Sequence, residues 1–259
     1  MFAPPSMRIR SEPALEAVDH ALCRSALWEA LALGFRRPTE ETVTRLAASE
    51  AAARLADAAA ALDRVEGSDL AARAYELAYD PLPSLGALEA AYARAFGHTA
   101  RGRVTPYETE YGEDSVWAPQ REMSDLGAFF RGFGLGLAPG AHERPDHVAC
   151  ECEFLMFLAR KEARALGVED DAMLAETRRA ARLFLRDHLG RWAPAFGAKL
   201  SREDRDGFYG ALGGLCAAFT IVECGRNSVA AGPEFLRLRS AVPDPLPMAC
   251  GGSPVPEGA

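Results

Sequence analysis

Residues 143–154 of this chain read Glu-Arg-Pro-Asp-His-Val-Ala-Cys-Glu-Cys-Glu-Phe, a stretch with the features of a helix start. Pro145 suits a first helical turn, where its missing N–H leaves no intrahelical bond unmade. Asp146 puts negative charge near the helix N-terminus, where the macrodipole favours it. We therefore predict that a helix begins here and that Gly167 ends it.

The segment behind this entry has the pattern of a buried helix. Mostly apolar side chains recur at steps of three and four residues, the spacing of one helix face. The expected stripe consists of Val148, Cys152, Leu155, Ala159, Glu162 and Leu166. His147 and Glu151 stand one turn apart, so their side chains can meet. A core helix with polar groups at its entry is the prediction.

Helical spacing also continues on both sides of this segment. Before it, we expect helices from Ser11 to Arg37-Pro38, from a Thr39 cap to Leu62, from Ser68 to Tyr79 and from a Ser84 cap to Phe96. Helices are also expected from Pro119 to Gly134, from Glu169 to His188 and from a Ser201 cap through Val222, with a short turn at 192–200. No sustained strand alternation is present. The sequence predicts an all-α, single-domain helical bundle at 1–241 and a Pro- and Gly-rich disordered tail at 242–259.

Residues 97–117 lack the helical period. Glycines and a proline are interspersed with Tyr107, Tyr111 and Trp117, and Glu108 and Glu110 lie among them. A loop this long in a compact domain is usually functional or disordered. The spaced aromatic residues indicate that it packs onto another surface.

Charge and composition narrow the class of partner. The 259 residues carry a net charge of -8, which argues against nucleic acid and favours a basic partner. No apolar run has the length of a bilayer span, and the N-terminus has no apolar signal region. Six scattered cysteines are typical of reduced thiols rather than a disulfide framework. We expect a cytoplasmic protein without stable membrane insertion.

Several motifs occur in a characteristic order. They are Tyr92-Ala-Arg-Ala-Phe96, Pro106-Tyr-Glu-Thr-Glu-Tyr-Gly112, Glu122-Met-Ser-Asp-Leu126, Phe129-Phe-Arg-Gly-Phe-Gly-Leu135, and Glu143-Arg-Pro-Asp-His147 followed by Glu151-Cys-Glu-Phe-Leu155. This series resembles the TorD/DmsD family, the dedicated cytoplasmic chaperones of molybdopterin oxidoreductases. The resemblance covers about residues 92–166, and residues 27–38 resemble the opening helix of the family. The 107–112 motif is most similar to the branch that serves type II enzymes of the dimethyl sulfoxide reductase class.

The resemblance implies a TorD-like helical fold, no catalytic residues and no cofactor of its own. It also implies a client-specific chaperone that binds the catalytic subunit and its twin-arginine signal peptide during cofactor insertion and proofreading. Such a protein is expected as a monomer or weak homodimer. Carboxylates can hold guanidinium groups bidentately, and aromatic rings can take apolar peptide residues. The candidate client-binding residues are Asp146, His147, Glu143, Pro145, Glu151, Tyr92, Phe96, Tyr107, Glu108, Glu110, Tyr111 and Trp117.

Several of these residues also have a structural interpretation, although Tyr107, Tyr111 and Trp117 are less easily explained as core. Asp146 and His147 can serve the helix start alone, Tyr92 and Phe96 can be core, and Glu108 and Glu110 can be solvated loop charges. The stretch from Glu143 to Glu153 also contains carboxylate, imidazole and thiol groups, the chemistry of metal ligands. A helical metal-binding protein or enzyme using this cluster is therefore the alternative function. Against a metal site, Cys150 and Cys152 are two residues apart and point to different helix faces.

Overall fold

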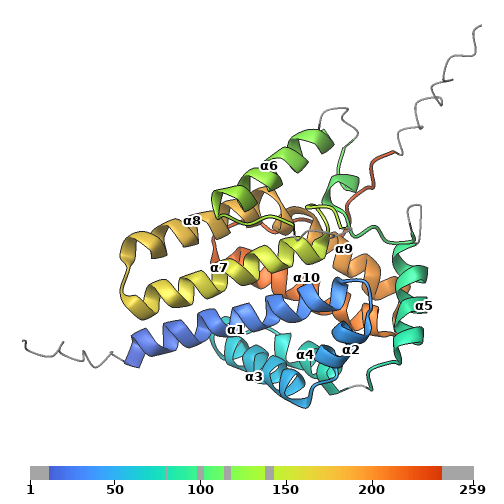
Figure 1. The fold of residues 1–259 in the computed structure, drawn as a ribbon, viewed down its shortest axis with the longest axis horizontal. Helices are drawn as coiled ribbons and strands as arrows, with labels where there is room; N and C mark the ends of the chain where they lie inside the picture. The colour runs from blue at the N-terminus through green and yellow to red at the C-terminus, as the bar shows by residue number, and fades with distance from the viewer. Residues whose placement is uncertain (1–11, 80, 98–101, 114–117, 138–142, 241–259) are drawn as a thin grey trace, which may run out of the picture.

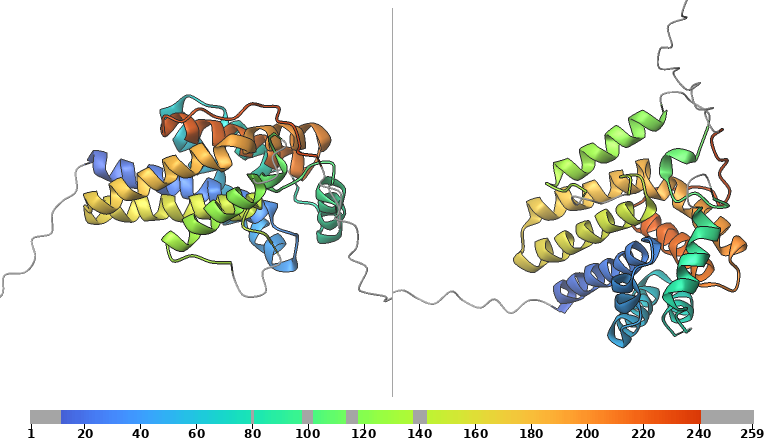
Figure 2. Two further views of the ribbon diagram at one scale, coloured as in Figure 1. Left: turned by 90° about the horizontal axis from the view of Figure 1, so that it is seen from above. Right: turned by 45° about the vertical axis from the view of Figure 1, so that its right-hand side comes forward.

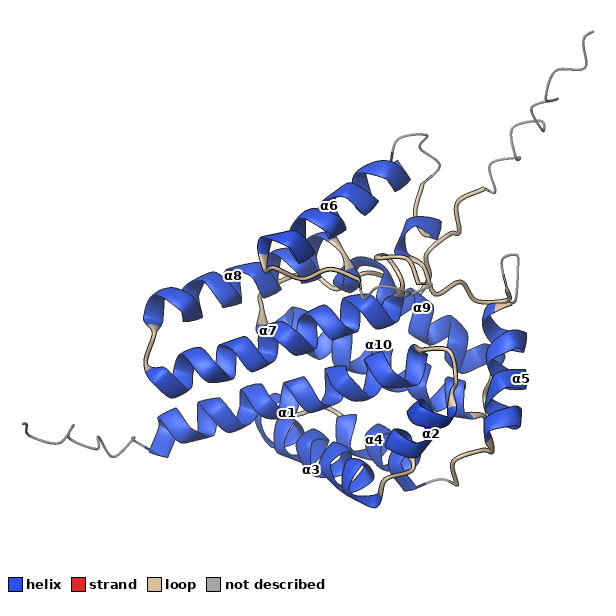
Figure 3. Cartoon of the chain, viewed as in Figure 1, coloured by secondary structure: helices blue, strands red, loops and turns tan. Residues whose placement is uncertain are grey.

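A computed structural model describes residues 12–79, 81–97, 102–113, 118–137 and 143–240. Trp117 and the predicted tail at 242–259 lie outside these ranges. Within them the structure is helical without any strand, which confirms the all-α prediction (Figure 3). Isolated bridges join only Tyr107 to His147 and Tyr111 to Leu238 among the described residues.

The chain forms ten α-helices and one 3-10 turn over the described residues. They are α1 (Glu12–Phe35), α2 (Glu40–Leu46), α3 (Ser49–Glu66), α4 (Leu70–Tyr79), α5 (Leu85–Phe96), η1 (Glu108–Glu110), α6 (Ala118–Gly132), α7 (Val148–Val168), α8 (Asp171–Asp187), α9 (Leu189–Glu203) and α10 (Phe208–Arg226). Side-chain caps form at Thr39 and Ser84, which confirms these two predicted starts. Asp170 caps α8, one residue after the predicted start at Glu169.

Helices α1, α7 and α8 lie side by side, and α6 lies next to α8 at the edge of this layer (Figure 1). Helices α9 and α10 pack together behind this layer, while α3 and α4 pair on the other side of α1. Helix α5 stands at the end of the bundle, across the direction of α1 and α7 (Figure 2). The end of the bundle beside α5 therefore brings together segments that are distant in sequence.

The core is built around large aromatic side chains from several helices. Those that are almost completely buried are Trp28, Phe35, Tyr111, Phe184, Trp192, Phe196, Tyr209 and Phe219. Rings from α1 and α9 meet between Phe35 and Phe196, with centroids 5.3 Å apart. Burial of such side chains supplies the main driving force for folding.

Helix α10 has the length and apolar composition of a possible membrane span, at variance with the sequence expectation. More than half of its apolar window is nevertheless buried inside the bundle. Gly197 of α9 and Gly213 of α10 allow the two helices to approach closely. A Cβ atom at Gly197 would stand 2.3 Å from the Gly213 carbonyl oxygen, which is sterically forbidden.

Two predicted helix boundaries in the N- and C-terminal regions were wrong. The helix expected from Thr39 to Leu62 is split, because α2 ends at Leu46 and Ala48 has an extended backbone before α3. Ser201 does not cap the last helix, since it lies inside α9 and α10 begins after Gly207. Ala and Ser are compatible with helix interiors, so local sequence does not mark either position.

The central helix also begins and ends later than predicted. His147 is the N-cap residue of α7, so Pro145 and Asp146 precede the helix. Its C-terminal cap is Glu169, whose φ of 56° lies in the left-handed region, rather than Gly167. The predicted stripe is buried from Val148 to Glu162, and Leu166 is half-buried.

Candidate functional site

His147 caps α7 with its imidazole ring. Its Nδ1 atom accepts a hydrogen bond from the Ala149 amide at 3.2 Å, and its Nε2 atom lies 3.7 Å from Glu143. Burial, with a smaller contribution from the Arg144 charge, lowers the pKa of His147 to about 3. The ring is therefore neutral at physiological pH, as an accepting cap requires. The predicted contact between His147 and Glu151 does not form.

Asp146 joins the entry of α7 to the 102–113 loop. Its buried carboxylate accepts hydrogen bonds from Arg144 Nε at 3.0 Å and Nη2 at 2.6 Å. The Thr109 hydroxyl donates to the same carboxylate at 2.7 Å, and the Thr109 amide donates at 3.3 Å. Asp146 thus fixes both Arg144 and the loop, and its own side chain has no exposed surface.

A second charged network holds the other side of this loop. Glu108 is buried, and its carboxylate lies 3.1 Å from His188 Nδ1 and 3.2 Å from Arg191 Nη2. Burial raises the pKa of Glu108 despite these two partners. Arg191 and Arg239 also donate to Glu122 of α6, and these bonds outweigh burial and lower the pKa of Glu122. The loop is therefore anchored to α6, α9 and the segment after α10.

Glu151 lies deeper, beneath the loop. It is completely buried, and its Oε2 atom accepts a hydrogen bond from Trp192 Nε1 at 3.5 Å. Burial, reinforced by the nearby Glu108 and Asp146 charges, raises the pKa of Glu151 well above its ordinary value. A carboxyl group in this setting favours its neutral form.

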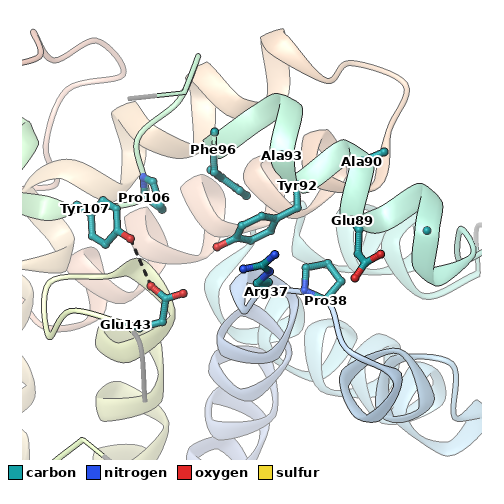
Figure 4. A pocket seen from close by; sticks show the side chains of 12 residues that line it. Arg37, Pro38, Glu89, Ala90, Tyr92, Ala93, Phe96, Pro106, Tyr107 and Glu143 are labelled. Carbon is teal, nitrogen blue, oxygen red and sulfur yellow. Dashed lines mark hydrogen bonds between the residues drawn. The ribbon is translucent and has the colours of Figure 1, made fainter. Parts of the chain in front are cut away.

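A groove opens where α5 meets the end of α1 and the loop, and Figure 4 shows it from close by. We call it the α5 groove; its volume is about 480 Å³. Its lining residues are Arg37, Pro38, Gly86, Glu89, Ala90, Tyr92, Ala93, Phe96, Gly97, Pro106, Tyr107 and Glu143. Four separated stretches of the chain therefore form its walls.

Aromatic rings and a carboxylate lie close together in the α5 groove. The Tyr107 hydroxyl donates a hydrogen bond to Glu143 Oε2 at 3.4 Å (Figure 4). Burial, followed by the Glu143 charge, raises the pKa of Tyr107 to about 12. Arg144 stacks over the Tyr107 ring, with its guanidinium carbon 4.5 Å from the ring centroid. Tyr92 and Phe96 form an edge-to-face pair with centroids 4.8 Å apart.

The α5 groove brings together four of the predicted client-binding residues: Glu143, Tyr92, Phe96 and Tyr107. Phe96 also packs on Tyr209 and Phe196, so its core and lining interpretations both hold. The structure buries Asp146, His147, Glu108, Glu151 and Tyr111, and it leaves Pro145 and Glu110 half-buried. Trp117 lies outside the described residues. A client-binding role for each of these twelve residues stays a prediction.

Eight of the twelve lining residues were not among the candidates from the sequence, and three of these eight are Arg37, Pro38 and Glu89. Arg37 and Pro38 were interpreted only as a helix stop, and Glu89 is one of several exposed residues of α5. The Arg-Pro pair did indicate a non-helical residue at the end of α1. Nothing local, however, places it opposite α5.

The alternative metal-binding function lacks a visible set of ligands. In the parts of the chain that the structure describes, no three His, Cys, Asp or Glu side chains converge as a metal site requires. Glu151 and Cys152 are buried, whereas Glu153 is exposed and bound to Arg36 at 2.7 Å. The polar groups of the 143–153 stretch thus face different surroundings.

Comparison with known proteins identifies relatives of this chain. The profile of the family described as nitrate reductase delta subunit matches residues 45–198. The selenate reductase assembly chaperone protein of Thauera selenatis is 35% identical over 130 residues, which are 48% of this chain and 63% of that protein. The dimethyl sulfide dehydrogenase assembly chaperone protein of Rhodovulum sulfidophilum is 33% identical over 177 residues, 66% of each chain.

Chaperone protein TorD of Vibrio cholerae is 28% identical over 134 residues, which are 51% of this chain and 58% of that protein. The chain thus matches about three-fifths of the length of these curated relatives. The two assembly chaperones, at 33% and 35% identity, are more similar to this chain than TorD is.

Proposed function

Because the chain belongs to the nitrate reductase delta subunit family, with TorD among its relatives, we propose that it is a client-specific assembly chaperone and not an enzyme. Its client is the catalytic subunit of a molybdopterin oxidoreductase, which it binds in the cytoplasm before cofactor insertion and export. The similarity to the selenate reductase and dimethyl sulfide dehydrogenase assembly chaperones supports this proposal.

The α5 groove is the proposed binding site for the twin-arginine leader of that client. The observation that carries this assignment is the Glu143 carboxylate, which lies beside Tyr107 in a groove that also contains Tyr92. A guanidinium group can pair with the carboxylate and stack on a ring, and apolar leader residues can pack against Phe96. A volume of about 480 Å³ suits a short stretch of extended peptide rather than a folded domain.

A peptide titration tests the proposal. The probe is a fluorescein-labelled synthetic peptide with an Arg-Arg pair followed by an apolar stretch, titrated at low salt. Glu143→Gln removes the carboxylate charge and should weaken binding by about tenfold. Glu153→Gln is the control, because Glu153 is exposed outside the groove lining. Absence of binding by the wild-type protein would contradict the proposal that this chain binds a leader peptide. Equal binding by Glu143→Gln and wild type would show that the peptide binds outside the α5 groove.

A further inference from the structure

Arg37 contributes a positive charge to a groove that otherwise contains carboxylates and aromatic rings. It follows the end of α1 and precedes Pro38, whose ring disfavours a helical conformation at Arg37. The side chain therefore leaves the helix end and enters the α5 groove. In Figure 4 its guanidinium group lies beneath the Tyr92 side chain, with Glu143 on one side and Glu89 on the other.

The guanidinium group of Arg37 has unused hydrogen-bond donors. Within the described residues it has no acceptor and no ion-pair partner, although an arginine carries five N–H groups. The adjacent Arg36 differs, because its Nη2 atom binds Glu153 at 2.7 Å. The two successive arginines therefore differ. Arg36 is ion-paired with Glu153, whereas the Arg37 guanidinium group lies in the groove with its N–H donors available.

We propose that Arg37 is a specificity-determining residue of the α5 groove, where it donates to an acceptor oxygen of the bound peptide. This inference rests on the proposed function, which makes a cationic peptide the occupant. The charges across the groove run from Glu143 through Arg37 to Glu89, so they match a peptide whose acceptor lies between two cationic groups. The planar fork of arginine suits a main-chain carbonyl or an acidic side chain.

The same charge also disfavours an incorrect register. An arginine of the peptide that faced Arg37 would meet a like charge, whereas one facing Glu143 or Glu89 would meet an opposite charge. Specificity commonly combines an attractive contact with such a repulsive one. Arg37 therefore sets the register of the peptide as well as contributing to affinity.

Binding measurements on Arg37 variants test the inference with the same Arg-Arg probe peptide. Arg37→Ala should weaken binding by about tenfold, and Arg37→Lys should lie between it and wild type, because lysine keeps the charge but loses the fork. Arg36→Ala is the matched control and should bind as wild type does. Thermal melts should coincide for wild type and Arg37→Ala, since Arg37 is exposed and unpaired within the described chain.

Modified peptides identify the acceptor. A backbone ester after the Arg-Arg pair weakens the main-chain acceptor. For an acidic acceptor, a second probe carries a glutamate next to the Arg-Arg pair and is compared with the same peptide carrying glutamine at that position. Whichever modification weakens wild-type binding but leaves Arg37→Ala unaffected identifies the oxygen that Arg37 contacts. The inference would be overturned if neither modification affected wild type and Arg37→Ala differently. It would also be overturned if Arg37→Ala bound the probe as tightly as wild type or more tightly. Both outcomes would leave the groove assignment intact. No binding by wild type would overturn both.

Discussion

Glu143 and Asp146 are only three positions apart in the sequence, yet their carboxylates lie in different environments. Glu143 faces the α5 groove and meets the Tyr107 hydroxyl, whereas Asp146 is buried under Arg144 and Thr109. The turn before α7 separates the two side chains. One motif can therefore supply both a ligand-facing charge and a buried anchor for the neighbouring loop.

Asp146→Asn should lower stability more than it lowers peptide affinity. The change removes the charge that Arg144 and Thr109 share, and a broken buried hydrogen-bond network of this kind costs about 1–3 kcal/mol. Urea unfolding measures this cost, and a peptide titration of the folded protein measures affinity. Asp125→Asn, at an exposed position on α6, is the control. Unchanged stability together with tenfold weaker binding would show that Asp146 contacts the peptide.

Glu151→Gln should stabilise the protein increasingly as pH rises. The pKa of Glu151 is higher in the folded protein than in the unfolded chain. As pH rises above the unfolded pKa, ionisation of Glu151 therefore favours the unfolded chain and lowers the free energy of unfolding. Glutamine stays neutral and can still accept from Trp192. Melting temperatures at about pH 5 and about pH 8 should therefore show a larger gain at the higher pH. Glu153→Gln, at an exposed position, should show no such trend. A gain from Glu151→Gln that did not change with pH would contradict ionisation of Glu151 as its cause.

At the scale of elements, the charged loop and the helices depend on different interactions. The 102–113 loop is anchored through Glu108 and Thr109, and the Tyr111 hydroxyl holds the loop to itself by donating to the Thr105 carbonyl at 2.8 Å. Helices α9 and α10 instead approach through glycines. Because α9 also carries His188 at its start and Arg191 in its first turn, the position of this helix affects the anchoring of the loop.

Gly197→Ala should destabilise the protein by about 1–3 kcal/mol, the usual cost of overpacking. The added methyl group would meet the Gly213 carbonyl oxygen and force α9 away from α10. Gly225→Ala provides the matched control, since a Cβ atom there meets nothing within 4 Å. Replacing glycine by alanine in an open helical position should leave stability unchanged or raise it. Equal unfolding free energies for the two variants would contradict the close-packing argument.

The whole molecule carries a net charge of -8, which favours approach of a cationic leader from solution. The proposed contacts at Glu143 and Glu89 lie at an open groove, so dissolved ions screen them. Long-range attraction and local pairing should therefore weaken together as salt increases.

Affinity for the Arg-Arg probe peptide should fall as ionic strength rises, and Glu143→Gln should show a smaller dependence on salt. The measurement is a fluorescence titration of both proteins at several NaCl concentrations. A probe with both arginines replaced by glutamine serves as the control for apolar binding. Salt-independent affinity of the wild type would show that charge contributes little to recognition.

Much of this architecture was determined by local sequence. Apolar periodicity and the caps at Thr39, Ser84 and Asp170 specify helices through contacts within a few residues. The ordered motifs between Tyr92 and Leu155 also sufficed to indicate the family, and they included four residues of the groove lining.

Tertiary structure alone decided which polar residues are buried and which face the groove. The burial of Asp146, the break between α2 and α3, and the continuous α9 depend on packing against distant helices, which overrides weak local preferences. The α5 groove likewise requires Arg37, Tyr92 and Glu143 to meet across more than a hundred residues of chain. Such a meeting is fixed by the buried core that orients α1, α5 and α7, so no local pattern could specify it.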